Sequence, residues 1–359
     1  MRRKAYEEVS LVVDGTLHDG ESGSLCGGQE QTTDEGGAES DNGGYKIAFS
    51  NSYVGNAWRT AAVNIFDAYT ADLVEQGVLS KAYSSSAGDD VQAQINEIRN
   101  MMSEGYDAIV CIAASATGLQ SVLEEAEERG IVVVCFDTTV DSDLVYNVNT
   151  DQFEYGRLLA QSLADRMGGE GNILWIKGIE GNRVTLDRTE GMQSVLDNYP
   201  GIKVLGDGYG KWDDSTTASV MSNLMSAYAS QGIDGILSEG GGGHAIVQSL
   251  VENGIDPATV PISEGEMFNS FMKDWVEMDL DAFCTAQPPY LAAAAVDVAL
   301  KVLNGEEVEP MTYVDLPTCS SKEEAEEKWY QPDQEGGFVC DWTDNNNTWN
   351  LTIEDVAPN

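Results

Sequence analysis

The chain has 359 residues, of which 42% are hydrophobic and 8% aromatic, enough apolar content for two folded domains with buried cores. Its 61 acidic and 19 basic residues give a formal net charge of -42. A surface this negative repels phosphate groups, so nucleic acid is excluded as an expected partner. The excess carboxylates are interpreted as a solvated surface.

The first 44 residues are polar and show no apolar periodicity. They end in a tract of Gly, Ser, Glu and Asp that begins at Cys26, a composition typical of a flexible tether. An unstructured chain end is the alternative interpretation. The stretch before Cys26 is too polar to supply the apolar region of roughly 7–15 residues that a signal peptide needs. No later apolar run approaches the roughly 18 residues of a membrane span.

The chain has 6 cysteines but no CxxC pair or Cys/His cluster with zinc spacing, so we expect no metal. Cys111 and Cys135 lie inside apolar runs and are expected in the core. Cys319 and Cys340 flank a polar segment and could pair in an oxidising compartment. Cys284 could instead form the disulfide with either of them.

From Tyr45 the sequence alternates short apolar strands with amphipathic helices. The first strand is expected over 46–50, and the helix from about Trp58 places its apolar residues on one face. The next predicted elements are a strand from 79, a helix over 91–102, a strand over 107–112, a helix over 119–126 and a strand over 131–137. The continuous β-branched run of the last strand predicts a parallel sheet covered by helices on both faces.

A second series of the same kind follows Tyr146. Helices are expected over 152–167, 186–198, 215–230 and 244–253, alternating with strands over 172–177, 203–208, 234–238 and 260–263. The fold class is therefore α/β, with two doubly wound parallel-sheet lobes. No GxGxxG follows the first strand and no GxxxxGK[ST] occurs, so no nucleotide cofactor is expected. The run Gly240–Gly243 could hold an anion at a helix start, but we favour a flexible loop or a close backbone approach.

The segment SNSYVGNAWR at 50–59 resembles the ribose and galactofuranose branch of bacterial periplasmic sugar-binding proteins, a resemblance that covers roughly 45–316. It implies the type I periplasmic binding protein fold, with two lobes joined by a three-segment hinge. The implied division is a tether over 1–44, an N-terminal lobe over 45–148 and 287–312, and a C-terminal lobe and tail over 149–286 and 313–359. The hinge is expected around Asn149, Ala286 and Val314.

The resemblance also implies which side chains line a sugar-binding cleft between the lobes. They are Ser52, Asn56, Trp58, Arg59, Asp137, Thr150, Arg188, Trp212, Glu239, Glu264 and Gln287. Carboxylates, amides and arginines suit hydroxyls that both donate and accept, and indole rings suit the apolar faces of a sugar ring. The alternative for Trp58 is a residue at the start of a helix that packs on its own lobe.

Two departures from the family leave the identity of the ligand open. Thr138 stands where relatives often have an arginine after the carboxylate of Asp137. Ser238-Glu239-Gly240 stands where relatives have an Asn-Asp pair, so Glu239 is the polar candidate there.

The resemblance implies an extracytoplasmic solute-binding protein that captures a sugar and delivers it to the permease of an ABC importer. It further implies a monomer that is not an enzyme, and Cys26 resembles the lipid-modified cysteine of a bacterial lipoprotein, although Leu25 precedes it where a small residue is usual. The alternatives are a sensor that presents its liganded form to a chemoreceptor or kinase, and a protein that binds a non-sugar solute. A transcription regulator is disfavoured because no basic helix-turn-helix precedes the core, and a hydrolase because GxSxG and HExxH are absent.

The segment 318–359 extends past the resemblance and contains a helical stretch from Lys322. We expect Trp329, Trp342 and Trp349 in this segment to pack against a lobe rather than to contact ligand.

Overall fold

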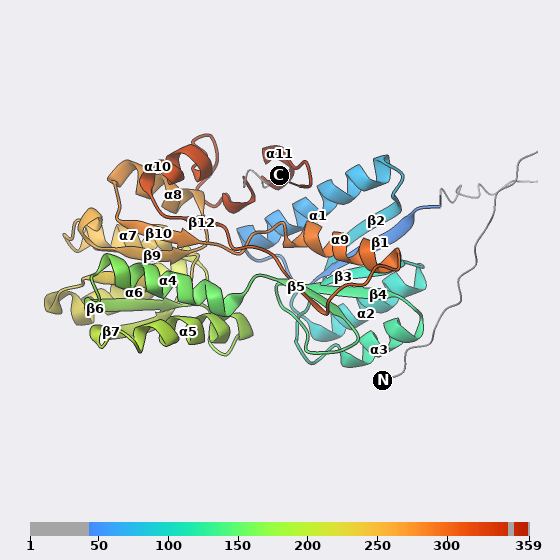
Figure 1. Ribbon diagram of the computed structural model, residues 1–359, viewed down its shortest axis with the longest axis horizontal. Coiled ribbons are helices and arrows are strands. Elements are labelled where there is room, and N and C mark those ends of the chain that lie inside the picture. Colours follow the sequence, from blue (N-terminus) through green and yellow to red (C-terminus); the bar gives the residue numbers. More distant parts are fainter. Residues whose placement is uncertain (1–42, 344–347, 358–359) are drawn as a thin grey trace, which may run out of the picture. The chain divides into compact units, whose positions relative to one another are not determined.

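The computed structural model describes residues 43–343 and 348–357, which fall within one compact unit that begins at Asp41. Cys26 and nearly all of the predicted tether over 1–44 lie outside the described residues. In the described part, two six-stranded sheets, each covered by helices, form the two lobes (Figure 1). The predicted α/β class with two parallel-sheet lobes is confirmed.

The sheet of the first lobe has the strand order β11-β5-β4-β3-β1-β2, and all its neighbouring strands are parallel. Its strands are β1 (Tyr45–Asn51), β2 (Leu79–Ser86), β3 (Ala108–Ile112), β4 (Val132–Phe136), β5 (Tyr146–Asn149) and β11 (Met311–Tyr313). Its helices are α1 (Ala57–Glu75), α2 (Val91–Ser103), α3 (Gln120–Glu128) and α9 (Leu291–Leu303). Alternate residues of β3 face opposite sides, with Val110 in the α1 and α9 core and Cys111 in the α2 and α3 core. Burial of both faces explains the unbroken apolar runs.

The second sheet has the order β12-β10-β9-β8-β6-β7, parallel except for the antiparallel pair of β10 and β12. Its strands are β6 (Glu170–Lys177), β7 (Gly201–Tyr209), β8 (Gly235–Ser238), β9 (Ile262–Gly265), β10 (Ala282–Thr285) and β12 (Thr318–Cys319). Its helices are α4 (Gln152–Arg166), α5 (Arg183–Leu196), α6 (Asp214–Tyr228), α7 (Gly243–Glu252) and α8 (Asn269–Met278). Short single turns add η1 (Ala229–Gln231) and η2 (Pro257–Thr259).

Polar residues at the helix starts fix where several helices begin. The side-chain oxygens of Asp151, Asn182 and Asp213 accept backbone N–H groups in the first turns of α4, α5 and α6. Helix α5 therefore begins at Arg183, three residues before the start expected from its apolar pattern.

Three connections between the two sheets lie within the described residues, after β5, after β10 and between β11 and β12. The crossings are hydrogen-bonded to one another. The N–H of Val314 donates to the carbonyl of Asn149 at 2.9 Å, and the N–H of Ala286 donates to that of Pro317 at 3.2 Å. The three segments expected as a hinge thus lie side by side.

The C-terminal segment contacts both lobes. Ser321 caps α10 (Lys322–Glu324), which continues into the π-helical turn η3 (Ala325–Trp329), and Trp329 is fully buried. Farther on, Phe268 and Val339 form an isolated bridge, and the side-chain amide of Asn269 donates to carbonyls of the 331–335 loop.

Beyond η4 (Asp341–Thr343), the segment packs on the first lobe. The indole N–H of Trp349 donates to Asp297 at 2.8 Å, and helix α11 (Ile353–Val356) packs against α1. The amide of Asn64 on α1 donates to the carbonyls of Val356 and Ala357. The division that assigns 313–359 to the second lobe therefore differs from the structure, because β11 and α11 belong with the first. The expected packing of the three tryptophans on a lobe is found.

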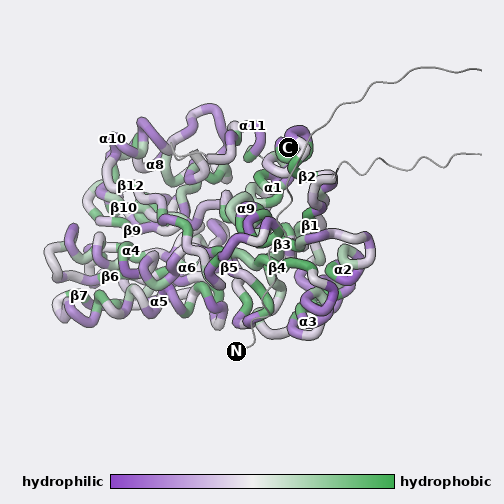
Figure 2. The backbone as a smooth tube through the Cα atoms, turned by 45° about the vertical axis from the view of Figure 1, so that its right-hand side comes forward, coloured by the Kyte–Doolittle hydropathy of each residue, from purple (hydrophilic) through white to green (hydrophobic). Residues whose placement is uncertain are grey.

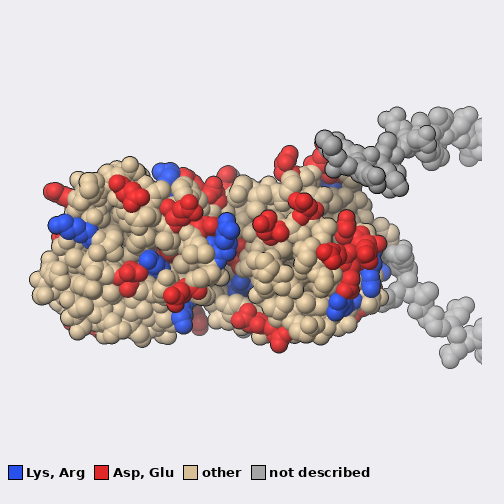
Figure 3. Space-filling view, turned by 90° about the horizontal axis from the view of Figure 1, so that it is seen from below, with Lys and Arg blue, Asp and Glu red and all other residues tan. Residues whose placement is uncertain are grey.

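Hydropathy follows this architecture: Figure 2 shows β3, β4 and α9 as mainly hydrophobic, whereas α2 and α3 alternate in character. On the face drawn in Figure 3, acidic side chains outnumber basic ones. Among the described residues, no helix is both long and apolar enough to cross a membrane.

The cysteines within the described residues occupy buried positions in both lobes. Cys111 and Cys135 are direct neighbours on β3 and β4, in the core as expected. The thiol of Cys319 lies 3.5 Å from the carbonyl of Ser321, that of Cys340 lies 3.5 Å from Asn269 Oδ1, and no disulfide joins the two. Cys284 lies directly opposite Cys319 on β10 and β12.

Helices α4 and α5 touch through glycines. A Cβ atom at Gly156 would lie 2.0 Å from the carbonyl oxygen of Arg188, and one at Gly191 would lie 2.0 Å from that of Phe153. The close approach places Arg188 over the ring of Tyr155, 3.6 Å from its centroid.

We expect Gly191→Ala to lower the free energy of unfolding by about 1–3 kcal/mol, because the methyl group would force the two helices apart. Urea unfolding followed by circular dichroism measures this change. Gly337→Ala is the matched control, since nothing lies within 4 Å of a Cβ atom there. Equal stability of the two variants would contradict the prediction.

Candidate functional site

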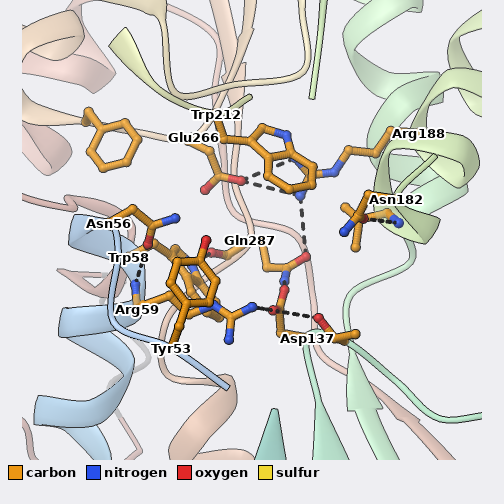
Figure 4. A pocket seen from close by; sticks show the side chains of 13 residues that line it. Tyr53, Asn56, Trp58, Arg59, Asp137, Asn182, Arg188, Trp212, Glu266 and Gln287 are labelled. Carbon is orange, nitrogen blue, oxygen red and sulfur yellow. Dashed lines mark hydrogen bonds and ion pairs between the residues drawn. The ribbon is translucent and has the colours of Figure 1, made fainter. Parts of the chain in front are cut away.

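A cavity is lined by side chains of both lobes and of the crossing after β10 (Figure 4). The lining residues are Tyr53, Asn56, Trp58, Arg59, Asp137, Thr138, Asn182, Val184, Arg188, Trp212, Glu266, Phe268 and Gln287. Many of them follow the carboxyl ends of β1, β4, β6, β7, β9 and β10. This is the edge at which open α/β sheets bind their ligands, because the loops from successive parallel strands converge there.

Arg59 is held in place by its own lobe. Asn56 caps α1 by accepting the N–H of Arg59 at 2.8 Å, which sets the start of the helix. The guanidinium then donates to Asn51 Oδ1 at 3.1 Å, Ser52 Oγ at 3.0 Å and Asp137 Oδ2 at 2.9 Å. Ser52 is thus buried behind the cavity and does not line it. Its hydroxyl orients the guanidinium of Arg59, which does line the cavity.

Asp137 has a left-handed backbone conformation, with φ of 58°. Such a conformation is unfavourable for a non-glycine residue and is kept only where its surroundings enforce it. The amide of Asn149 donates to the carbonyl of Asp137 at 2.9 Å and provides part of that support. The carboxylate accepts hydrogen bonds from Arg59 and Gln287.

Gln287 joins the two sides of the cavity. Its Nε2 donates to Asp137 Oδ1 at 2.5 Å, and its Oε1 accepts from Gln152 and, at 3.4 Å, from Arg188 Nη2. Its backbone carbonyl accepts the indole N–H of Trp58 at 2.6 Å. Thr150 supports this arrangement from behind, with its Oγ1 3.3 Å from Gln287 Oε1, and does not line the cavity.

Arg188 is almost fully buried, with 2% of its surface exposed, and all of its nitrogens have partners. Nε donates to Gln152 Oε1 at 2.8 Å, and Nη1 donates to the carbonyl of Glu239 at 2.9 Å. Both terminal nitrogens lie 3.4 Å from Glu266 Oε1. The predicted cavity arginine is therefore one half of a buried ion pair.

The two predicted indoles line the cavity from different lobes. Trp58 belongs to α1 and is 8% exposed, and its hydrogen bond crosses to Gln287 rather than staying within its helix. Trp212 follows β7 and has φ of 55°, which helps to aim the ring toward the cavity. Figure 4 shows the Trp212 ring beside Arg188 and the Tyr53 ring beside Arg59. Tyr53 was not anticipated as a lining residue.

Glu266 is the main lining residue that the sequence did not suggest. In extended backbone it would share a face with Glu264, two residues earlier, but its φ of 71° turns it into the cavity. Glu264 lines a neighbouring cavity instead, where its Oε1 accepts the N–H of Gly242 at 3.2 Å. Nothing in the local sequence indicates that Glu266, and not Glu264, lines the first cavity.

Glu239 lies behind the cavity and not in its lining. Its carboxylate accepts the N–H of Gly178 and the hydroxyl of Thr189, each at 2.9 Å. It thereby fixes the loop after β6 and the body of α5, which carries Arg188. The glycines that follow it are buried, and a Cβ atom on Gly241 would lie 2.5 Å from the backbone of Trp212, as expected for a close backbone approach.

The cavity offers paired charges and aromatic faces. Arg59 pairs with Asp137, and Arg188 pairs with Glu266, so the charges within the lining balance. The remaining polar groups are amides and hydroxyls that both donate and accept. This chemistry suits an uncharged ligand that carries several hydroxyl groups.

Two buried carboxyl groups near the cavity have raised pKa values. Burial raises the pKa of Glu264 from 4.5 to about 8, and burial raises that of Glu239 to about 7 although Arg188 opposes it. A folded-state pKa above the unfolded value means that the folded protein binds more protons in this range. The contribution of these two carboxyls to folding stability is therefore largest below about pH 4.5. It is lost as pH rises through their folded-state pKa values.

We expect the melting temperature to fall between pH 5 and pH 8, and Glu264→Gln to flatten that dependence. The control is Glu125→Gln, because Arg99 lowers the pKa of that half-buried carboxyl and its titration lies below this window. Differential scanning calorimetry across the pH series measures the slope. An unchanged slope in Glu264→Gln would refute the assignment.

Comparisons with known proteins bear on this site. A xylitol-binding protein of Mycolicibacterium smegmatis is 31% identical over 172 residues, 47% of this chain and 49% of that protein. The D-xylose-binding periplasmic protein of Escherichia coli is 31% identical over 87 residues, 24% of this chain and 26% of that protein. The chain thus spans about half or less of the length of these curated relatives.

Solved structures resemble the whole fold. An ABC transporter periplasmic solute-binding protein of Actinobacillus succinogenes with bound D-allose has a TM-score of 0.70 at 21% identity, covering 79% of this chain and 99% of that one. A galactofuranose-binding protein has a TM-score of 0.69 at 21% identity, covering 79% and 96%. At this level of identity the likeness concerns the fold.

The model of one protein family, described as the periplasmic binding protein domain, matches residues 47–307. That range includes both sheets except for β1's first residues, β11 and β12, and it includes every residue named above as lining the cavity. The chain belongs to the periplasmic binding protein domain family.

Proposed function

We propose that this chain is an extracytoplasmic solute-binding protein that captures a sugar between its two lobes and delivers it to the permease of an ABC importer, without catalysing a reaction. The observation that carries the proposal is the hydrogen-bonded series Arg59, Asp137, Gln287, Arg188 and Glu266, which runs from one lobe to the other along one cavity. A ligand bound against this series contacts both lobes at once.

The relatives support this class of ligand. Their names refer to xylitol and D-xylose, and the structures of similar fold include one with bound D-allose. Each of these is a neutral polyhydroxyl compound, as the balanced charges of the cavity require. We further propose that the protein acts as a monomer, and that Cys26 anchors it to the membrane as a lipoprotein.

We expect a panel of neutral monosaccharides and polyols to contain a ligand that binds with a micromolar or lower Kd and raises the melting temperature. Thermal shift followed by isothermal titration calorimetry measures both. If an amino acid or a nucleoside binds while every sugar and polyol fails, the proposal is wrong.

Trp58→Ala should weaken binding of that ligand by at least about tenfold, because the variant loses a ring face and the bond that fixes Gln287. Asp137→Asn should weaken binding by a similar factor, because it removes the charge that holds Arg59. The control is Tyr83→Ala, which removes an exposed aromatic ring from β2, away from the cavity lining. Wild-type affinity in both cavity variants would refute the site.

A further inference from the structure

A second cavity adjoins the first and shares Asn56, Trp212, Glu266 and Phe268 with it. It is the larger of the two, at about 460 Å³ against about 70 Å³. Ligand sites for small molecules commonly have volumes of about 300–1,000 Å³. The first cavity falls below this range and the second within it, so a ligand that outgrows the first cavity has room to continue into the second.

The lining of the second cavity differs in chemistry from that of the first. Its ionisable groups are carboxyls, among them Asp213, Glu264 and Glu266, together with His244, and neither lysine nor arginine lines it. The rings of Trp212, Phe268 and Phe271 provide apolar surface. Oxygen acceptors beside aromatic faces suit a group that has many hydroxyl donors and an apolar ring face.

Two of these carboxylates are incompletely bonded. Glu264 is 1% exposed and Glu266 is 8% exposed, and each has one oxygen with a partner and one oxygen, Oε2, with none. The indole N–H of Trp212 also has no partner. Buried polar atoms are rarely left in this state, because each unmade bond costs about 1–3 kcal/mol. All three atoms are buried beneath the cavity surface, so ligand hydroxyl groups would complete their bonding once a rotation of these side chains turned the atoms toward the cavity.

The C-terminal segment contributes a wall of this cavity. Gly336 and Gly337 line it, and the carbonyl of Gly336 accepts the N–H of Ser270 at 2.9 Å, which fixes the segment against α8. Both glycines lie beyond the residues 47–307 that match the family domain. The second cavity is thus built partly from chain that the family domain does not include.

We propose that the second cavity binds a second sugar unit, so that the ligand of this protein is a disaccharide or longer glycoside with its first unit in the first cavity. The proposal rests on the proposed function, because it assumes a sugar beside Trp58 and Arg59. It adds that units in the two cavities are recognised by different groups, arginine-carboxylate pairs in one and carboxylates with aromatic rings in the other.

The test compares monosaccharides with their disaccharides by isothermal titration calorimetry on the full chain. The probes are xylose with xylobiose, galactose with lactose, and glucose with cellobiose and maltose. We expect at least one disaccharide to bind about tenfold or more tightly than its monosaccharide, because it gains contacts in the second cavity.

Gly337→Phe places a ring in the second cavity without touching the first. A Cβ atom at Gly337 has nothing within 4 Å, so Gly337→Ala is the matched control for the backbone change. Gly337→Phe should weaken disaccharide binding by about tenfold or more and leave monosaccharide binding within about twofold. Ser270→Phe, which fills the cavity from α8, should do the same and covers the case in which Gly337→Phe fails to fold.

The outcomes separate this proposal from the function on which it rests. If monosaccharides bind and no disaccharide binds more tightly than its monosaccharide, the second sugar site is refuted while the proposed function stands. The second sugar site is also refuted if Gly337→Phe and Ser270→Phe both fold and both lose affinity for monosaccharides and disaccharides to the same extent. If no sugar of either length binds, sugar binding itself is refuted.

Discussion

The side chain of Gln287 connects two buried arginine-carboxylate pairs, and the arrangement of the cavity depends on this connection. Isolated buried charges are costly, and an ion pair is tolerated in a dry site only when its remaining donors and acceptors are also bonded. Gln287 provides one such hydrogen bond to each pair, since it donates to Asp137 and accepts from Arg188. It lies directly after β10, where the chain passes from one lobe to the other. The network is therefore built where the lobes are covalently joined.

Much of this fold could be predicted because its signals are local. The apolar run of β4 and the one-sided apolar pattern of α1 reflect burial, and burial leaves a regular period in the sequence. Trp58, Arg59, Arg188 and Gln287 lie in segments that match a family in order and line the cavity, while their contact with a ligand stays a prediction. Helix α5 began earlier than its apolar pattern indicated, because the cap formed by Asn182 decides the start.

The remaining features of the site depend on backbone geometry that no residue pattern reports. Asp137, Trp212 and Glu266 all have positive φ although none is glycine. Glu266 lines both cavities, whereas Glu264, two residues earlier, lines only the second. Glu239 shows a second limit of prediction from sequence. A carboxylate beside a glycine run suggested a ligand contact, whereas its partners are a backbone N–H and a threonine within its own lobe. Which partner a buried carboxylate finds is decided by packing across distant elements.

The C-terminal segment has a consequence for how far the two lobes can separate. It is fixed to the second lobe at Val339, through the bridge to Phe268, and to the first lobe at Trp349, through Asp297. The ten Cα–Cα steps from Val339 to Trp349 have a contour length of at most about 36 Å, so the chain itself sets an upper limit on the distance between the two anchors. Unlike the three crossings, which lie together, this connection acts at a distance from the hinge, where a given rotation produces a larger displacement. An opening that exceeded the limit would have to release one anchor first.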